Sequence, residues 1–222
     1  MDKVLFVAAH PDDETLGCGG TILKYKKNKD EIYWLIVTSA LIEEGFDQKR
    51  IASRQKEIEK VAQLYGFDKI IQLNIPTTKV DRFSMSELVG RMSKVISDLQ
   101  PTVIYLPNQS DVHTDHQTIF KAAFSCTKNF RYPYIKEILM YETLSETEFA
   151  PALSKDVFIP NVYVDIEDYF DKKVEVFQVY ESEVMGNPYP RSIAAIEALA
   201  RFRGSSIGKK YAEAFALLKR IR

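Results

Sequence analysis

Short apolar runs alternate with longer amphipathic stretches along the first 125 or so residues of this chain. The first run, Val4–Ala9, is continuously apolar, which is typical of a central parallel strand that is covered on both faces. Further strands are predicted at Glu31–Thr38, Lys69–Leu73 and Thr102–Leu106. This alternation predicts a Rossmann-like α/β fold, in which a parallel sheet is flanked by helices.

Helical periodicity and capping residues locate the helices between these strands. The clearest is Asp47–Tyr65, a charged amphipathic segment that Gly66 follows as a C-terminal cap. The other helices expected in this part are Glu14–Lys27, Ser84–Leu99 and His116–Ser125. Farther along we expect extended segments at Glu137–Tyr141 and Val162–Asp165, and helices at Ile166–Glu183, Ser192–Arg203 and Gly208–Leu218. Because no repeat, low-complexity run or linker interrupts the chain, residues 1–222 are expected to form a single domain.

Composition argues against several classes of protein. A hydrophobic fraction of 45% and a charged fraction of 27% are those of an ordinary globular protein, and a net charge of −1 gives no reason to expect nucleic-acid binding. No stretch approaches the roughly 18 apolar residues that a membrane span needs. The first residues predict a buried strand rather than a signal peptide, and two cysteines are too few for a disulfide framework. We therefore expect a cytoplasmic protein without a membrane span.

All three histidines lie in two short acidic motifs. The motif His10-Pro11-Asp12-Asp13-Glu14 comes directly after the first predicted strand, and Asp111-Val112-His113-Thr114-Asp115-His116 follows the strand that ends at Leu106. Ligands of doubly wound sheets bind beyond the carboxyl ends of the strands, where the strand order reverses. Imidazoles and carboxylates together suit a borderline divalent ion, zinc first, with other divalent metals left open. The motifs therefore predict a metal-dependent hydrolase.

Helix N-capping is the simplest alternative for the consecutive aspartates, but it does not account for the histidines. A catalytic zinc typically has three protein ligands and one water. His10 and Asp13 can converge on such an ion from one tight turn. Either His113 or His116 completes the set, or both do, since positions i and i+3 share one helix face. Asp12 is then left as a candidate general base.

The first motif carries a family resemblance. Ala9-His10-Pro11-Asp12-Asp13-Glu14, followed by Leu16-Gly17-Cys18-Gly19-Gly20-Thr21, resembles the PIG-L/LmbE-like family of zinc-dependent sugar N-deacetylases. His113-Thr114-Asp115-His116 is similar to the second element of that family. Weaker similarity lies in the spacing of Arg54 and Glu57 and in Tyr180-Glu181-Ser182-Glu183. The resemblance covers residues 3 to about 120 well and the rest loosely.

The resemblance implies a metal site and a reaction. His10, Asp13 and His116 would hold the zinc, and Asp12 would be the general base that deprotonates the zinc-bound water. The substrate would be a small N-acetylglucosamine-type sugar conjugate, whose amide is hydrolysed to give acetate and an amino sugar. The resemblance is also compatible with a homo-oligomer.

Three further residues receive roles from the same resemblance. His113 would stabilise the tetrahedral oxyanion and protonate the leaving amine, and Asp115 would orient a histidine. Arg54 resembles a substrate-binding arginine at the pocket rim, with a surface ion pair to Glu57 as the alternative. Val112 stands where arginine or a larger polar residue is common in some members. It leaves open a GlcNAc-malate conjugate, a nucleotide sugar or a polysaccharide intermediate as the substrate.

Two other functions stay open. A metal-dependent amidase or deformylase acting on another acylamino sugar would use the same reaction centre. A non-catalytic, metal-dependent sugar-binding module would need neither Asp12 nor His113, and this chain has both. A dinucleotide site at Gly17-Cys18-Gly19-Gly20 is disfavoured because these glycines do not follow the strand directly. We expect them to allow close packing of the first helix instead.

Overall fold

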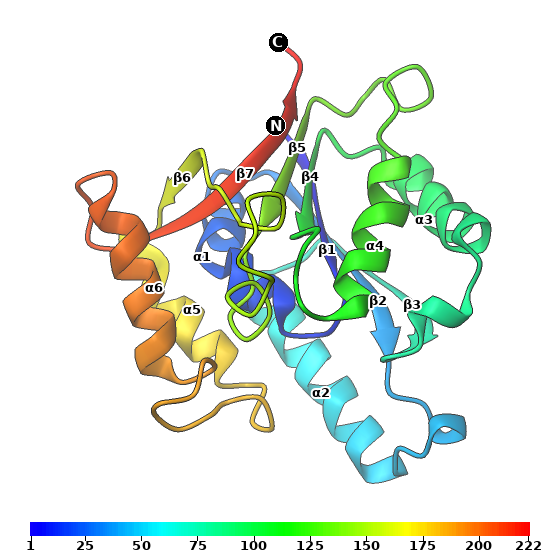
Figure 1. The fold of residues 1–222 in the computed structure, drawn as a ribbon, viewed down its shortest axis with the longest axis horizontal. Helices are drawn as coiled ribbons and strands as arrows, with labels where there is room; N and C mark the ends of the chain where they lie inside the picture. The colour runs from blue at the N-terminus through cyan, green and yellow to red at the C-terminus, as the bar shows by residue number, and fades with distance from the viewer.

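The computed structural model describes residues 1–222 and contains a seven-stranded sheet with the order β3-β2-β1-β4-β5-β7-β6 (Figure 1). The strands are β1 (Lys3–Ala8), β2 (Glu31–Ser39), β3 (Lys69–Pro76), β4 (Val103–Pro107), β5 (Glu137–Tyr141), β6 (Val162–Asp165) and β7 (Ala212–Arg220). The first five pair in parallel, whereas β7 pairs antiparallel with β5 and β6. The predicted α/β fold with a mostly parallel sheet is confirmed, and β3 continues beyond its predicted end at Leu73.

Helices cover both faces of the sheet (Figure 1). One face packs against α1 (Asp13–Lys27), α2 (Gln48–Tyr65), α5 (Phe170–Phe177) and α6 (Ile193–Ser205), and the other against α3 (Met85–Leu99) and α4 (Thr114–Ser125). Each face buries a cluster of 25 residues, so the central strands are shielded from water on both sides. This is why β1, β2 and β4 are apolar at nearly every position instead of alternately. None of the helices combines the length and the apolar character that a membrane crossing needs.

Side-chain caps set the ends of the helices that the sequence predicts best. At the start of α2, Asp47 accepts the backbone N–H of Arg50 at 2.8 Å, and Gly66, with φ 70°, ends the helix. Ser84 and Glu87 form a capping box at the start of α3. Because these signals are local, both helices begin within one residue of their predicted starts.

The helix predicted at Gly208–Leu218 is wrong, because Ala212–Arg220 forms strand β7. Ala, Glu, Leu and Lys favour a helix in isolation, which explains the error. In the fold, the segment lies between two strands, with Ala216 opposite Met140 of β5 and Phe215 opposite Val162 of β6. Two hydrogen-bonded ladders outweigh differences in helix propensity of under about 1 kcal/mol per residue.

The helix predicted at Ile166–Glu183 is shorter than expected. A 3-10 turn at Glu167–Tyr169 leads into α5, which ends at Phe177. Residues 178–192 then run without regular structure to α6, and we call this segment the 178–192 connection. Near its start the buried Tyr180 hydroxyl donates to Glu14 Oε1 at 2.8 Å, so the connection contacts the first turn of α1.

Helix α1 lies close to the sheet and to the following elements. A Cβ on Gly17 would lie 2.3 Å from Tyr141 Cδ2, and one on Gly20 would lie 2.6 Å from Ile166 Cβ. Cys18, between these glycines, is fully buried. The expectation that the glycines allow close helix packing is confirmed, because a larger side chain would push α1 away from its neighbours.

Candidate active site

The two acidic histidine motifs meet at the carboxyl ends of β1 and β4. His10, Asp12 and Asp13 lie at the turn between β1 and α1, and His113 and His116 lie at the start of α4. β1 and β4 are parallel neighbours in the sheet. The chain continues from β1 to β2 and β3 on one side, and from β4 to β5 on the other. The motifs therefore occupy the point where the strand order reverses, as ligand sites of such sheets do.

Three ligand atoms form a small triangle in this site. Asp13 Oδ2 lies 3.6 Å from His10 Nδ1 and 3.3 Å from His116 Nε2, and the two nitrogens are 3.4 Å apart. A tetrahedral zinc with bonds of about 2.0–2.1 Å holds its ligand atoms roughly 3.3 Å apart. The donor set thus fits a zinc-sized tetrahedral ion with one corner open. Asp13 and His116 are buried, while the His10 side chain is 20% exposed and borders the pocket.

Each of these histidines has a carboxylate on its other ring nitrogen. Asp111 Oδ2 lies 2.8 Å from His116 Nδ1, and Asp115 Oδ2 lies 3.2 Å from His10 Nε2. Such carboxylates fix the tautomer and the ring orientation of metal-binding histidines. They leave His116 Nε2 and His10 Nδ1, the two nitrogens of the triangle, as the metal-facing atoms.

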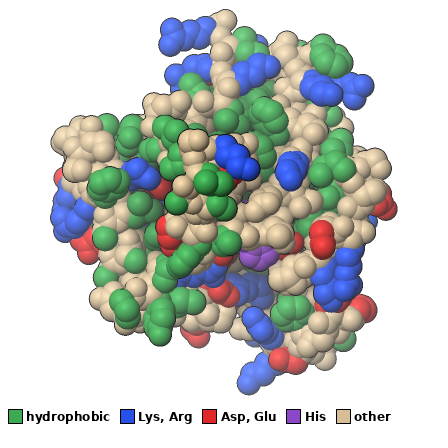
Figure 2. Space-filling view, viewed as in Figure 1, with side chains coloured by type: hydrophobic (Ala, Val, Ile, Leu, Met, Phe, Trp, Pro, Cys, Tyr) green, Lys and Arg blue, Asp and Glu red, His purple; other side chains and the backbone are tan.

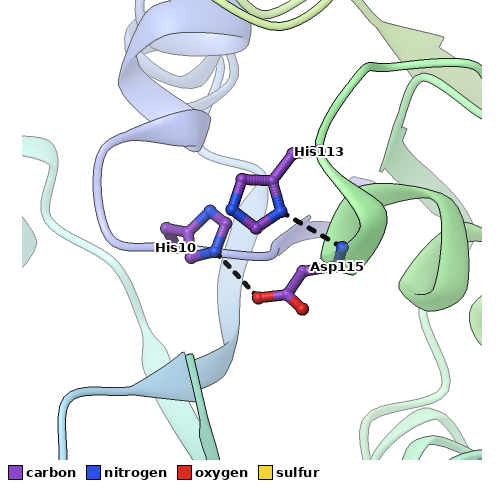
Figure 3. Close-up of side chains that lie close together, drawn as sticks. All are labelled: His10, His113 and Asp115. Atoms are coloured by element: carbon purple, nitrogen blue, oxygen red, sulfur yellow. Dashed lines mark hydrogen bonds and ion pairs between the residues drawn. The ribbon is translucent and has the colours of Figure 1, made fainter. Parts of the chain in front are cut away.

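A second group of possible ligands comprises His10, His113 and Asp115 (Figure 3). In this group, His10 Nε2 lies 3.2 Å from Asp115 Oδ2. The Asp115 carboxylate already accepts the N–H of Thr78 at 2.7 Å as well as the ring of His10. His113 Nδ1 accepts the backbone N–H of Asp115 at 3.1 Å (Figure 3). This group is therefore better described as the support of His10 than as a second metal site.

Charge within the triangle favours a cation. Burial alone would raise the pKa of Asp13, but the imidazoles of His116 and His10 hold it well below its usual range. Burial disfavours the imidazolium forms, but the surrounding carboxylates raise the pKa of His10 to about 9 and that of His116 well above its ordinary value. Three carboxylates around two imidazoles can compensate a divalent ion, which would displace the ring protons on binding.

Asp12 is buried like its neighbour Asp13, but its backbone conformation and its contacts are different. Its backbone φ of 138° is rare for a residue with a side chain. Its buried carboxylate borders the pocket, and Oδ2 accepts from Arg191 Nη1 at 3.0 Å. Burial raises the pKa of Asp12 to about 7, although Arg191 opposes that shift. Asp12 can therefore exchange a proton near neutral pH.

His113 is the N-cap of α4 and borders the same pocket. Because Nδ1 accepts a backbone N–H, the neutral ring carries its proton on Nε2. Burial and the neighbouring His10 lower the pKa of His113 to about 4. The side chain is thus a neutral hydrogen-bond donor, with its ring centre 4.5 Å from that of His10.

A pocket of about 400 Å³ opens beside these residues. Figure 2 shows exposed histidine surface in a hollow near the centre of one face, with arginine and lysine side chains below it. Arg54 lines the pocket, as predicted, but its guanidinium is engaged by Glu183, by Glu57 at 3.3 Å and by Ser182 at 3.1 Å. Arg50 also lines the pocket and has a cation–π contact with Phe46 at 5.2 Å.

Arg191 and Glu183 lie in the 178–192 connection and border the pocket. Sequence reasoning missed Arg191, and it included Glu183 in a segment similar to the family without giving it a role. An isolated arginine in an irregular segment carries no local signal of a site. The sequence could have identified the hydrogen-bond partner of His116, because Asp111 stands five residues before it in the same motif.

The chain is similar to a known family and to several known proteins. Residues 5–127 match the family model described as PIG-L: GlcNAc-PI de-N-acetylase. The chain is 26% identical over 185 residues to the uncharacterized deacetylase YaiS of Escherichia coli, covering 81% of this chain and 90% of that protein. It is 24% identical over 225 residues to diacetylchitobiose deacetylase of Thermococcus kodakarensis, with coverage of 96% and 82%. Among solved structures, N,N'-diacetylchitobiose deacetylase of Pyrococcus horikoshii superposes with a TM-score of 0.78 at 25% identity, covering 98% of this chain and 84% of that one.

Proposed function

This chain belongs to the family of GlcNAc-PI de-N-acetylases, and on that basis we propose that it hydrolyses the N-acetyl amide of an N-acetylglucosamine-type sugar conjugate. The products would be acetate and an amino sugar. One observation carries the proposal: the three ligand atoms leave a fourth tetrahedral position free, and His10 of the triangle borders a pocket that Asp12 and His113 also border. Relatives named as deacetylases of diacetylchitobiose support the substrate class.

Zinc is the metal we propose for the triangle of His10 Nδ1, Asp13 Oδ2 and His116 Nε2. The mixed nitrogen and oxygen donors and their spacing support this choice. When bound, zinc supplies Lewis acidity, which polarises an amide carbonyl and lowers the pKa of water to about 7.

The side chains around the metal site would transfer the proton, stabilise the oxyanion and orient the metal ligands. Asp12 takes a proton from the attacking water, which suits a carboxyl whose pKa burial raises to about 7. The resemblance assigns protonation of the leaving amine to His113, but we propose Asp12 for that step as well, because the neutral His113 ring would have to become an imidazolate. His113 Nε2–H donates to the developing oxyanion, because its neutral tautomer presents that proton. Asp115 and Asp111 hold His10 and His116 in their metal-binding orientations.

Arg54 stays a proposed substrate-binding residue. Its position in the pocket lining supports that role, and its ion pairs with Glu183 and Glu57 favour a structural one. The Arg54→Ala variant distinguishes the substrate-binding role from the structural one, because loss of a substrate contact raises KM or lowers kcat/KM.

We also propose a cytoplasmic location, with which two buried, unpaired cysteines agree.

Release of free amine tests the proposed function. The panel contains N-acetylglucosamine, N,N'-diacetylchitobiose, the malate glycoside of N-acetylglucosamine, UDP-N-acetylglucosamine and N-formylglucosamine, each with zinc-loaded and chelator-stripped protein. We expect zinc-dependent release from at least one N-acetyl sugar, and the sugar that is hydrolysed fastest would identify the preferred aglycone. Release from the formyl compound alone would favour a deformylase. Saturable sugar binding without release by zinc-loaded protein would favour a binding module.

A further inference from the structure

Arg191 reaches the candidate base from a part of the chain outside both histidine motifs. It lies in the 178–192 connection, and its Nη1 donates to Asp12 Oδ2 at 3.0 Å across 179 residues of sequence. The arginine side chain is 16% exposed and that of Asp12 is 3% exposed. The ion pair is therefore largely shielded from water, so the attraction between the two charges is stronger than it would be at an exposed site.

Every nitrogen of the Arg191 guanidinium is engaged within the protein. Nη1 also donates to Glu183 Oε2 at 2.6 Å, and Nε donates to Ser145 Oγ at 2.8 Å. Nη2 lies 3.5 Å from Glu146 Oε1. This pattern is that of an arginine that holds other side chains in place, rather than one that offers its guanidinium to a substrate.

Glu183 joins Arg191 to Arg54. Its Oε2 accepts from Arg191 and its Oε1 accepts from Arg54 Nη2. Arg54 Nη1 in turn donates to the carbonyl of Pro11 at 3.4 Å. The Arg–Glu–Arg bridge therefore contacts two successive residues of the turn before α1, the backbone of Pro11 and the side chain of Asp12.

Asp12 needs such support because of its backbone. Residues in rarely populated conformations persist where the surrounding contacts over-determine them. For Asp12, with φ 138°, the backbone N–H donates to Glu14 Oε2 at 3.1 Å and the carboxylate accepts from Arg191. One contact holds the main chain and the other holds the side chain.

We propose that Arg191, itself held by Glu183, is a positioning residue that fixes the Asp12 carboxylate toward the open corner of the metal site without contacting substrate. The inference rests on the proposed function, in which Asp12 is the general base. A lysine would not serve equally well, because one ammonium group cannot reproduce the planar fork that contacts Asp12, Glu183 and Ser145 together.

Steady-state kinetics of Arg191→Ala and Arg191→Lys test this role. We expect Arg191→Ala to keep its zinc and its KM while kcat falls on the order of 10²-fold, because a misplaced base lowers the rate without removing a substrate contact. Arg191→Lys should recover little of the loss. The matched control is Arg203→Ala, which removes an equally exposed arginine, also 16%, from a two-pronged pair with Glu142 outside the pocket. It should leave kcat and KM unchanged.

A double-mutant cycle separates positioning from general destabilisation. In an Asp12→Ala background, Arg191→Ala should cause no further loss of kcat, since the side chain that it positions is gone. An equal loss in both backgrounds would contradict the proposal. So would a rise in KM at unchanged kcat, which would make Arg191 a substrate-binding residue.

Crystal structures of the zinc-loaded native protein and of Arg191→Ala test the same idea without turnover. We expect the Asp12 carboxylate to turn away from the open corner in the variant while the three metal ligands stay in place. An unmoved Asp12 would overturn the positioning role even in an active deacetylase. A moved Asp12 in a protein that releases no amine from any conjugate would instead remove the proposed function and leave the positioning contact standing.

Discussion

Asp12 and Asp13 are adjacent carboxylates in opposite environments. Asp13 lies among two imidazoles that hold its pKa well below the ordinary value. Asp12 faces the pocket, where burial raises its pKa to about 7 against the opposing charge of Arg191. Pairs of carboxyl groups whose pKa values are pushed apart commonly divide catalytic tasks between them. This difference supports the proposed roles of Asp13 in metal binding and of Asp12 in proton transfer.

Replacement of Asp12 by alanine separates these tasks. We expect Asp12→Ala to bind one zinc per chain but to lose on the order of 10²–10⁴-fold in kcat, the usual contribution of a general base. Asp13→Ala should lose zinc as well as activity. Metal analysis after dialysis and amine release measure both quantities. Undiminished turnover of Asp12→Ala would remove it as the base.

The two histidines of the second motif should differ in metal affinity. His116 Nε2 belongs to the ligand triangle, whereas His113 uses Nδ1 to cap α4. His116→Ala should therefore weaken zinc binding far more than His113→Ala, which should lower kcat with zinc retained. Competition with a chromogenic chelator measures both affinities. The reverse order would mean that the ligand and the oxyanion donor are exchanged.

Helix α1 is held by an ion pair from two elements that follow it much later in sequence. Lys173 of α5 donates to Glu213 of β7 at 2.7 Å and to the carbonyl of Leu16 at 2.8 Å. Glu213 also accepts the backbone N–H groups of Gly20 and Thr21 at 2.9 and 2.8 Å. The pair is buried against α1, so it links the helix that carries Asp13 to α5 and to β7, the strand next to the β6 edge of the sheet.

Lys173→Met should unfold more easily than the native protein. Removal of one partner leaves the buried Glu213 carboxylate uncompensated, and such losses cost about 3–5 kcal/mol of unfolding free energy. The adjacent Lys172 pairs with Glu175 at an exposed position, so Lys172→Met should cost at most about 1 kcal/mol. Urea denaturation of the two variants gives the comparison. Equal stability would mean that Lys173 contributes no more than a surface lysine.

The sheet joins two motifs that lie about a hundred residues apart in sequence. His10 and His116 meet because β1 and β4 are parallel neighbours, and each helix that follows carries its ligands to the same edge. A metal ion bound there would connect both halves of the fold. Its binding free energy would then add to the stability of the folded chain, since the unfolded chain has no such site.

Zinc should accordingly raise the thermal midpoint. At a free concentration of 100 times Kd, a ligand of the native state stabilises it by about 2.7 kcal/mol. For a chain of this length, that corresponds to roughly 5–10 °C in Tm. Calorimetry with and without zinc measures the shift, and His116→Ala should abolish it while Asp12→Ala retains it. An unchanged Tm of the native protein on addition of zinc would contradict the metal site.

The alternation of elements, the helix caps and the motifs at the strand ends are local patterns, and the sequence alone was enough to predict the parallel sheet, the ends of α2 and α3 and the meeting of His10 with the second motif. Tertiary contacts decided the rest. They turned Ala212–Arg220 into a strand, engaged Arg54 in ion pairs and brought Arg191 to Asp12. The physical reason is the sequence distance over which each interaction acts. Periodicity and capping act between residues a few positions apart. A neighbouring strand or the partner in a buried ion pair comes from a distant segment, which only the folded sheet brings into contact.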